Sequence, residues 1–331
     1  MRRRLVSFLV LLSVATSIGV LSVSRFRLGE GASDDIRGYV SIHRGDPLSE
    51  VAPPFRYRVL TPLVARAVPP PPASLFDDRR DFDDRVVLFR FAVVNTVGLA
   101  AAAWFLLLLM DAMGFEPWQS LVGSLLFLGS FLSLYSATLP RVDALGYAFL
   151  AGCLWALVSG RPVLLFALFS LGMFNKETIL LVPLAVLLLK QPRKARVVQL
   201  GCLIPALVAY FIFRVLLLPV EWPLYSVAST SKFAAEFFGN AQRFGFYTTR
   251  SAQVFGLLWL LAVWGWARNR HRTDHPLIRW SWMVPVVLVI PFALALTIHS
   301  MWAFAFPIVI PLAVWGLRDL WDDDKKAEEG R

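Results

Sequence analysis

Charged residues are scarce in this sequence of 331 residues. Asp, Glu, Lys and Arg make up 17% of it and hydrophobic residues 57%, whereas a soluble domain carries about 25% charged residues. The only two cysteines, Cys153 and Cys202, lie inside apolar stretches, which indicates small buried side chains rather than a disulfide pair. The sequence also lacks internal repeats, nucleotide-binding glycine motifs and cysteine clusters with metal-ligand spacing.

Hydrophobic residues gather in long blocks along the chain. Two of them, Val93–Met110 and Val197–Leu218, approach the roughly 20 apolar residues that cross a bilayer. The pattern predicts an all-α integral membrane protein with about ten transmembrane helices, two of them short. The predicted spans are residues 5–23, 86–110, 118–139, 144–158, 162–174, 177–189, 197–218, 251–267, 280–298 and 303–317.

The stretch over residues 162–189 has two interpretations. It is either one long helix with Asn175, Lys176 and Glu177 at its centre, or two short spans. One helix would put the basic segment Lys190–Arg196 outside the cell, against the preference of Lys- and Arg-rich short loops for the cytoplasm. The charge pattern therefore favours two short helices, as a hairpin or a strongly tilted pair.

Basic clusters beside the apolar spans indicate the orientation of the chain. The net charge of +10 comes largely from short clusters such as Arg2–Arg4, Lys190–Arg196 and Arg268–Arg272. This placement favours orientation in the membrane over a nucleic-acid partner. We expect a multi-pass protein of the cytoplasmic membrane with both termini in the cytoplasm. Residues 1–318 would form one transmembrane domain, followed by a short, charged and disordered tail over 319–331.

Two longer connections are predicted on the outer side, over residues 24–85 and 219–250. In the first, apolar residues recur near helical spacing between arginines over Pro54–Val68, which predicts a helix in the membrane interface. The second mixes aromatic and basic residues and also indicates an interfacial segment. Both loops are therefore expected to contact membrane lipids.

The predicted topology brings several charged segments to the outer side. Charged groups at membrane depth are costly, so they usually face a cavity, a partner or a functional site. The candidate site residues are Asp34, Asp35, Arg56, Tyr57, Arg58, Arg141, Asp143, Lys176, Glu177 and His299.

The acidic pair Asp34-Asp35 follows the first predicted helix. An aspartate there can take a proton from an acceptor hydroxyl or hold a metal ion. It can equally be a solvated turn or a helix N-cap. No cofactor is certain from the sequence, and a divalent cation at the acidic pair stays open.

The basic candidates also have two interpretations each. Arg56 and Arg58 suit a lipid phosphate because the guanidinium fork matches its oxygens, but Arg and Tyr, here with Tyr57, also anchor proteins at lipid headgroups. Arg141 and Asp143 bracket a predicted tight turn and can pair with each other or mark helix ends.

Lys176 and Glu177 are adjacent in an apolar segment. Because neighbouring helix residues do not face one another, each is expected to find a partner elsewhere, which favours a site role. His299 is more typical of an interfacial residue than of a catalytic one.

The order of these motifs resembles the C-type (GT-C) superfamily of membrane glycosyltransferases, especially its bacterial members. The motifs are the acidic pair, the segment Pro-Phe-Arg-Tyr-Arg-Val-Leu-Thr-Pro-Leu, the turn with Asp143 and the turn Asn-Lys-Glu-Thr. The resemblance implies transfer of a sugar from a polyprenyl-phosphate carrier to a lipid, glycan or protein acceptor outside the membrane. It implies catalysis by Asp34 or Asp35, and binding of the carrier phosphate by basic residues among Arg56, Arg58, Arg141 and Lys176.

The chain departs from that superfamily in two ways. It is short, and it lacks the soluble C-terminal domain of many members, so acceptor recognition would fall to the two outer loops or to a partner membrane protein. A lipid or solute transporter and a non-catalytic subunit of an envelope-assembly complex remain alternatives, because buried charges and broken helices also occur in carriers.

Overall fold

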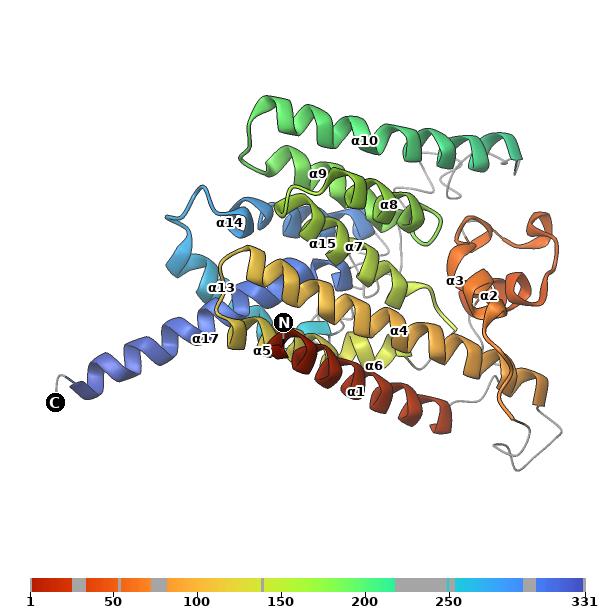
Figure 1. Ribbon diagram of the computed structural model, residues 1–331, viewed down its shortest axis with the longest axis horizontal. Coiled ribbons are helices and arrows are strands. Elements are labelled where there is room, and N and C mark those ends of the chain that lie inside the picture. The colour runs from red at the N-terminus through yellow and green to blue at the C-terminus, as the bar shows by residue number, and fades with distance from the viewer. Residues whose placement is uncertain are drawn as a thin grey trace.

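The computed structural model describes residues 2–25, 34–52, 55–72, 82–137, 140–217, 249, 254–293 and 302–329. Within these ranges the regular elements are helices and no strand occurs, which confirms the all-α prediction (Figure 1). The α-helices are α1 (Arg2–Arg25), α2 (Asp34–Arg44), α3 (Leu60–Ala67), α4 (Phe82–Ala112), α5 (Pro117–Leu128), α6 (Phe131–Ala137), α7 (Asp143–Val158), α8 (Pro162–Met173), α9 (Leu181–Leu188), α10 (Arg193–Ile212), α13 (Leu258–Asn269), α14 (Pro276–Trp280), α15 (Met283–Ala293) and α17 (Phe306–Glu329). Short turns of 3-10 helix, η2 (Phe55–Tyr57), η4 (Glu177–Leu180) and η6 (Ala303–Ala305), and of π-helix, η5 (Phe213–Leu217), adjoin them.

Three helices are long and apolar enough to cross a membrane by length and composition. They cover Asp83–Ala112, Arg193–Val215 and Ala303–Asp323. The other apolar helical stretches in the described part of the chain, among them Arg4–Val20 within the 24-residue helix α1, have 10–17 residues, whereas a crossing needs roughly 20. The structure therefore supports a helical membrane protein with three clear spans. It does not show the predicted number of about ten.

The α4 helix lies in the middle of the bundle, against α1, α5 and α7. Its sequence after the first turns is apolar on all sides, which is typical of a buried helix. A side chain at Gly98 would lie 2.9 Å from the backbone of Ala144 and Leu145, so α4 and α7 meet through a small residue, as membrane helices commonly do. This contact fixes the first turn of α7, where Asp143 lies.

Several predicted spans are interrupted in the structure. The predicted span over 118–139 is divided into α5 and α6, because the helix stops at Gly129. There the hydroxyls of Ser130 and Ser133 donate to the Phe127 carbonyl at 2.6 and 2.7 Å, beside the Ser130 amide at 3.1 Å, so side chains help to pair the carbonyls at the end of the helix. The predicted division of residues 162–189 into two short helices is confirmed, since α8 ends at Met173 and α9 begins at Leu181.

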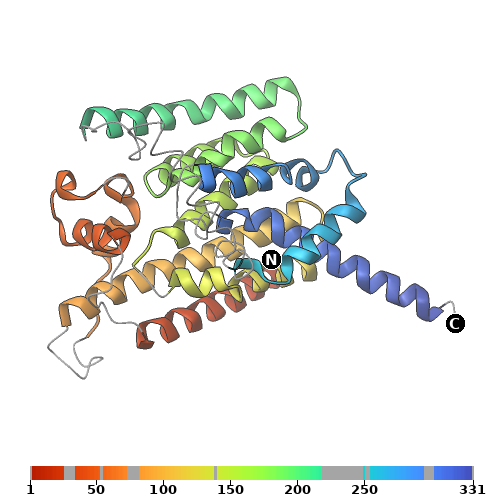
Figure 2. The same cartoon turned by 180° about the vertical axis from the view of Figure 1, so that it is seen from behind.

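The C-terminal tail differs from the sequence prediction. Residues expected to be disordered continue α17 to Glu329, and the helix extends past the bundle (Figure 2). Asn269 on α13 donates to the Asp319 carboxylate at 2.8 Å, and Arg268 pairs with Asp323. These contacts across two helices keep the charged segment helical, which its composition alone did not indicate.

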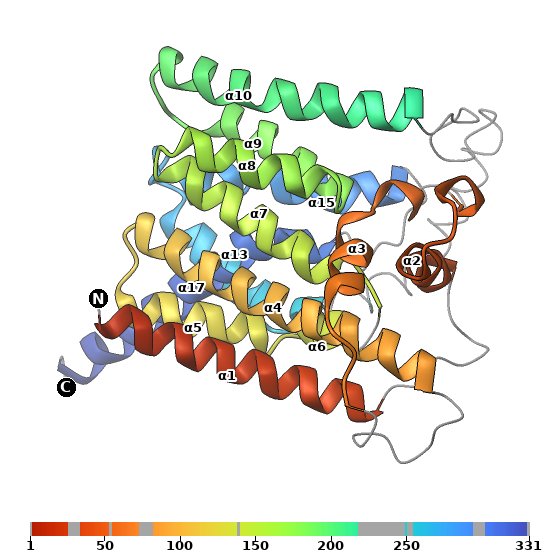
Figure 3. The same cartoon turned by 45° about the vertical axis from the view of Figure 1, so that its right-hand side comes forward.

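The first loop folds into helices at one end of the bundle. Figure 3 shows α2 and α3 at that end and both chain termini at the other. The helix predicted within Pro54–Val68 is confirmed in α3, whose Leu63 and Val64 are exposed while Ala65 is buried. The second predicted loop, over residues 219–250, lies outside the described residues except for Thr249.

Candidate functional site

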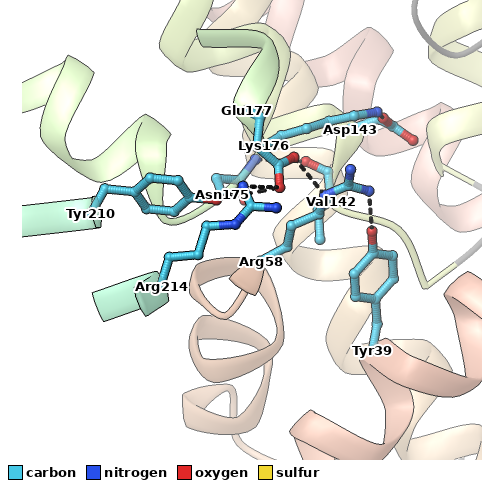
Figure 4. Close-up of polar contacts among 9 residues, drawn as sticks. All are labelled: Tyr39, Arg58, Val142, Asp143, Asn175, Lys176, Glu177, Tyr210 and Arg214. Carbon is cyan, nitrogen blue, oxygen red and sulfur yellow. Dashed lines mark hydrogen bonds and ion pairs between the residues drawn. The ribbon is translucent and has the colours of Figure 1, made fainter. Parts of the chain in front are cut away.

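Five segments of the chain bring ionic and hydrogen-bonding side chains together at the end of the bundle that α2 and α3 cover (Figure 4). They are α2, the η2–α3 segment, the turn before α7, the turn between α8 and η4, and the end of α10 with η5. We call the ionic side chains the charged cluster; its members are Asp35, Arg56, Arg58, Arg141, Asp143, Lys176, Glu177 and Arg214.

Asn175 ties three of these segments together. Its side-chain amide, which is fully buried, donates to the Val142 carbonyl at 2.8 Å and accepts from the Thr61 hydroxyl at 2.5 Å. The backbone supports the same junction, because the Leu60 amide donates to the Phe174 carbonyl at 3.1 Å. The break between α8 and η4 is therefore fixed by bonds to α3 and to the start of α7, not by its own sequence alone.

Lys176 and Asp143 form the most buried ion pair of the cluster. Both side chains are only 6% exposed, and the Lys176 ammonium also lies 4.9 Å from the centre of the Phe304 ring. Asp143 pairs with Lys176 rather than with its neighbour Arg141. This contact confirms that Lys176 finds its partner elsewhere in the chain.

Glu177 accepts contacts from two other elements. Arg58 donates to its carboxylate at 2.9 Å, the Tyr210 hydroxyl donates at 3.3 Å, and Arg214 Nη1 lies at 3.9 Å (Figure 4). Arg58 also donates to the Tyr39 hydroxyl at 3.1 Å. Glu177 thus links the first loop to the end of α10.

Tyr39 lies on α2, beside Arg58. Burial raises the pKa of this phenol to about 12, against the opposing charge of Arg58. The hydroxyl therefore keeps its proton at neutral pH, and it accepts a hydrogen bond from Arg58 as a neutral group.

Asp35 and Arg141 meet at the side of the cluster nearest to α2. Arg141 Nη2 lies 3.5 Å from Asp35 Oδ2, and the Arg141 guanidinium lies 4.5 Å from the centre of the Tyr135 ring. The Asp35 side chain is 24% exposed, more than those of Asp143 and Glu177. Among these three carboxylates, Asp35 is the one best placed to meet a substrate.

Tyr57 is fully buried beneath two arginines. Its ring lies 4.4 Å from the guanidinium of Arg214 and 5.5 Å from that of Arg56. Tyr57 is therefore a packed part of the cluster, and the interfacial anchor considered for it from the sequence does not describe its position.

Three residues in or next to the charged cluster were not predicted from the sequence. Tyr39, Tyr210 and Arg214 contact the predicted residues but were not among them. Arg214 is a lone charge inside the predicted span 197–218, so the cost of a charge at membrane depth would have singled it out. Two predicted residues have no described side-chain position: Asp34 is described only as the first residue of α2, and His299 lies outside the described residues.

The charged cluster has an excess of positive charge. Arg56, Arg58, Arg141, Lys176 and Arg214 outnumber the three carboxylates of Asp35, Asp143 and Glu177 in the described part of the chain. The structure supplies no metal centre there, since its described residues hold no group of three or more His, Cys, Asp or Glu side chains suited to an ion. The arrangement can accept an anionic group close to a partly exposed carboxylate.

No family model, curated protein or solved structure matches this chain. The charged cluster is therefore the feature of this protein that bears on its function.

Proposed function

We propose that this protein is a membrane glycosyltransferase of the GT-C type. It would move a sugar from a polyprenyl-phosphate carrier to an envelope lipid, glycan or protein acceptor on the outer face of the cytoplasmic membrane. The observation that carries this proposal is the excess of positive charge in the charged cluster, which contains the partly exposed Asp35. A lipid phosphate supplies the missing negative charge, and a nearby carboxylate serves an acceptor hydroxyl.

The proposed topology has about ten crossings with both termini in the cytoplasm. Basic residues at turns away from the charged cluster, such as Arg161, Lys190 and Arg193, support this orientation through the positive-inside preference. The paired short helices α8 and α9 would cross the membrane in opposite directions, with the turn that carries Lys176 and Glu177 on the outer side. The charged cluster then faces the outer side, at the depth of lipid phosphates.

The reaction is a single displacement at the sugar carbon. The cations hold the carrier phosphate and stabilise the charge that it gains as its bond to the sugar breaks. The acceptor oxygen forms the new bond, and its proton passes to the Asp35 carboxylate. The phosphate leaves with the electron pair of the broken bond, still attached to its polyprenyl chain. Asp143 and Glu177 keep Lys176 and Arg58 charged and in place.

A turnover assay with the full-length protein in lipid nanodiscs tests the proposal. Polyprenyl-phosphate sugars and mixed envelope-lipid acceptors are supplied, and release of polyprenyl phosphate is measured for wild type, Asp34→Asn and Asp35→Asn. We expect Asp35→Asn to abolish release. Asp84→Asn is a matched control, because Asp84 is an exposed aspartate paired with Arg44 outside the cluster. Wild-type turnover by both Asp34→Asn and Asp35→Asn would refute the catalytic assignment.

A second candidate function is transport of a lipid or solute. The observation that favours it is the break between α8 and α9, which carries the buried Lys176–Asp143 pair, because discontinuous helices form ion and substrate sites in carriers. Flux into proteoliposomes that depends on Asp143 or Lys176 and leaves no covalent product would favour transport over sugar transfer.

A further inference from the structure

Arg214 is a buried cation with two unpaired hydrogen-bond donor nitrogens. It lies on η5, directly after α10, and is only 9% exposed. One nitrogen, Nη1, donates to the Tyr210 hydroxyl at 3.5 Å and lies 3.9 Å from Glu177. The other two nitrogens, Nε and Nη2, are buried and have no hydrogen-bond partner among the described residues.

Other unpaired donors belong to Tyr57 and to Arg56, whose guanidinium lies 5.5 Å from the centre of the Tyr57 ring. The Tyr57 hydroxyl is buried without a partner in the described part of the chain, and so is Nε of Arg56. The guanidinium of Arg214 lies 4.4 Å from the centre of the Tyr57 ring, and this contact holds the two side chains together. Buried polar groups are normally hydrogen-bonded, so several unpaired donors around one aromatic ring indicate that an acceptor binds there.

The charges at this position also point to an anion. Glu177 is the carboxylate nearest to Arg214, but Arg58 already binds it at 2.9 Å, closer than Arg214 at 3.9 Å. Lys176 is likewise paired, with Asp143. Arg214 is therefore a buried cation that, unlike Lys176 and Arg58, has no close ion pair to neutralise its charge.

We propose that Arg214 and the Tyr57 hydroxyl form a phosphate-binding site, with Arg56 at its edge. A phosphate offers several acceptor oxygens, which match the two unpaired guanidinium nitrogens and the phenol. The phosphate can belong to a lipid carrier or be free in solution. The lipid source rests on the proposed function, whereas the phosphate chemistry rests on the unpaired donors alone.

Binding measured without any sugar donor separates this site from sugar transfer. The full-length protein in nanodiscs is titrated with polyprenyl monophosphate, with the corresponding polyprenol and with inorganic phosphate. The variants are Arg214→Gln, Arg214→Lys and Tyr57→Phe. Arg161→Gln is the matched control, because that guanidinium also lies over an aromatic ring, at 4.6 Å from Trp155, but at the start of α8, the end of that helix away from the charged cluster.

We expect Arg214→Gln to weaken binding of polyprenyl monophosphate about tenfold or more, since a charge-assisted hydrogen bond is lost. Tyr57→Phe, which removes only one oxygen, should weaken it about threefold to tenfold. Polyprenol binding and the Arg161→Gln control should not change. Arg214-dependent binding of inorganic phosphate would show that the headgroup suffices, and binding of the lipid phosphate alone would identify the lipid as the source.

Two results would overturn the site. One is equal affinity of wild type and Arg214→Gln for both phosphate probes. The other applies if Arg214→Gln does not fold: both Tyr57→Phe and Arg214→Lys would then bind the phosphate probes with the affinity of wild type. Loss of turnover in Asp35→Asn with phosphate binding intact would leave the site standing, so failure of the catalytic assignment and failure of the phosphate site are distinguishable.

Discussion

Asn175→Ala should loosen the junction between the first loop, α7 and the α8–η4 turn. The wild-type amide is fully buried, donates to the Val142 carbonyl at 2.8 Å and accepts from the Thr61 hydroxyl at 2.5 Å. Alanine can make neither bond. Because the site is buried, the Thr61 hydroxyl is left without its acceptor, whereas the Val142 carbonyl loses one of two donors and keeps the Gly146 amide at 3.2 Å.

The size of the effect follows from those two groups. The unsatisfied Thr61 hydroxyl costs about 1–3 kcal/mol and the lost bond to Val142 about 0.5–1.5 kcal/mol, so Asn175→Ala should lower the free energy of unfolding by about 1.5–4.5 kcal/mol. Thr61→Val removes one donor and keeps the side-chain shape, and it should cost about 1–2 kcal/mol. In the double variant the bond between them is already absent, so the two losses should not add.

Equilibrium unfolding in mixed micelles measures this coupling across wild type, Asn175→Ala, Thr61→Val and the double variant. We expect an interaction energy of about 1 kcal/mol or more. Ser170→Ala is the control, because that hydroxyl donates at 2.7 Å within α8 to Phe166 and is exposed. Losses that add to within about 0.5 kcal/mol would show that the Asn175 bonds do not hold the junction.

Two further predictions concern buried charge. Asp143→Asn should destabilise the fold by about 3–5 kcal/mol, because it leaves the Lys176 ammonium buried without its carboxylate, whereas Asp143→Asn combined with Lys176→Met should restore much of the loss. Equilibrium unfolding of both variants checks this, and a double variant as unstable as the single one would contradict it. Burial, with the charge of Arg90, lowers the pKa of His43 below 6.5, so the unfolded chain takes up a proton that the folded chain does not. Stability should therefore fall as the pH drops below 6.5, and His43→Phe, measured by unfolding at several pH values, should flatten that dependence; an unchanged slope would refute it.

The sequence predicted the positions of most helices but not all of their ends. The break after α8 was predicted because Asn175, Lys176 and Glu177 interrupt an apolar run and the next segment is basic. The break at Gly129 was missed because the apolar pattern runs on through it. The helical end of α17 was missed as well, since it depends on bonds to Arg268 and Asn269 of another helix.

Seven of the eight members of the charged cluster were named from the sequence, all except Arg214, but their pairings were not. Placing a charged side chain at membrane depth costs free energy, and this singled out Arg58, Asp143, Lys176 and Glu177 as groups that face a cavity, a partner or a functional site. It could not say that Lys176 binds Asp143, 33 residues away, or that Arg58 binds Glu177, 119 residues away. Arg214, a lone charge inside a predicted span, could have been singled out in the same way, but only the tertiary structure places it beside Tyr57.

The sequence by itself determined the helical, lipid-compatible character of this protein, because apolar runs and their period are local properties that any packing must respect. The tertiary structure alone decided which buried charges neutralise one another and which donors stay unpaired. Those outcomes depend on where helix ends and loops meet in space, and side chains far apart in the sequence interact only after the bundle has packed.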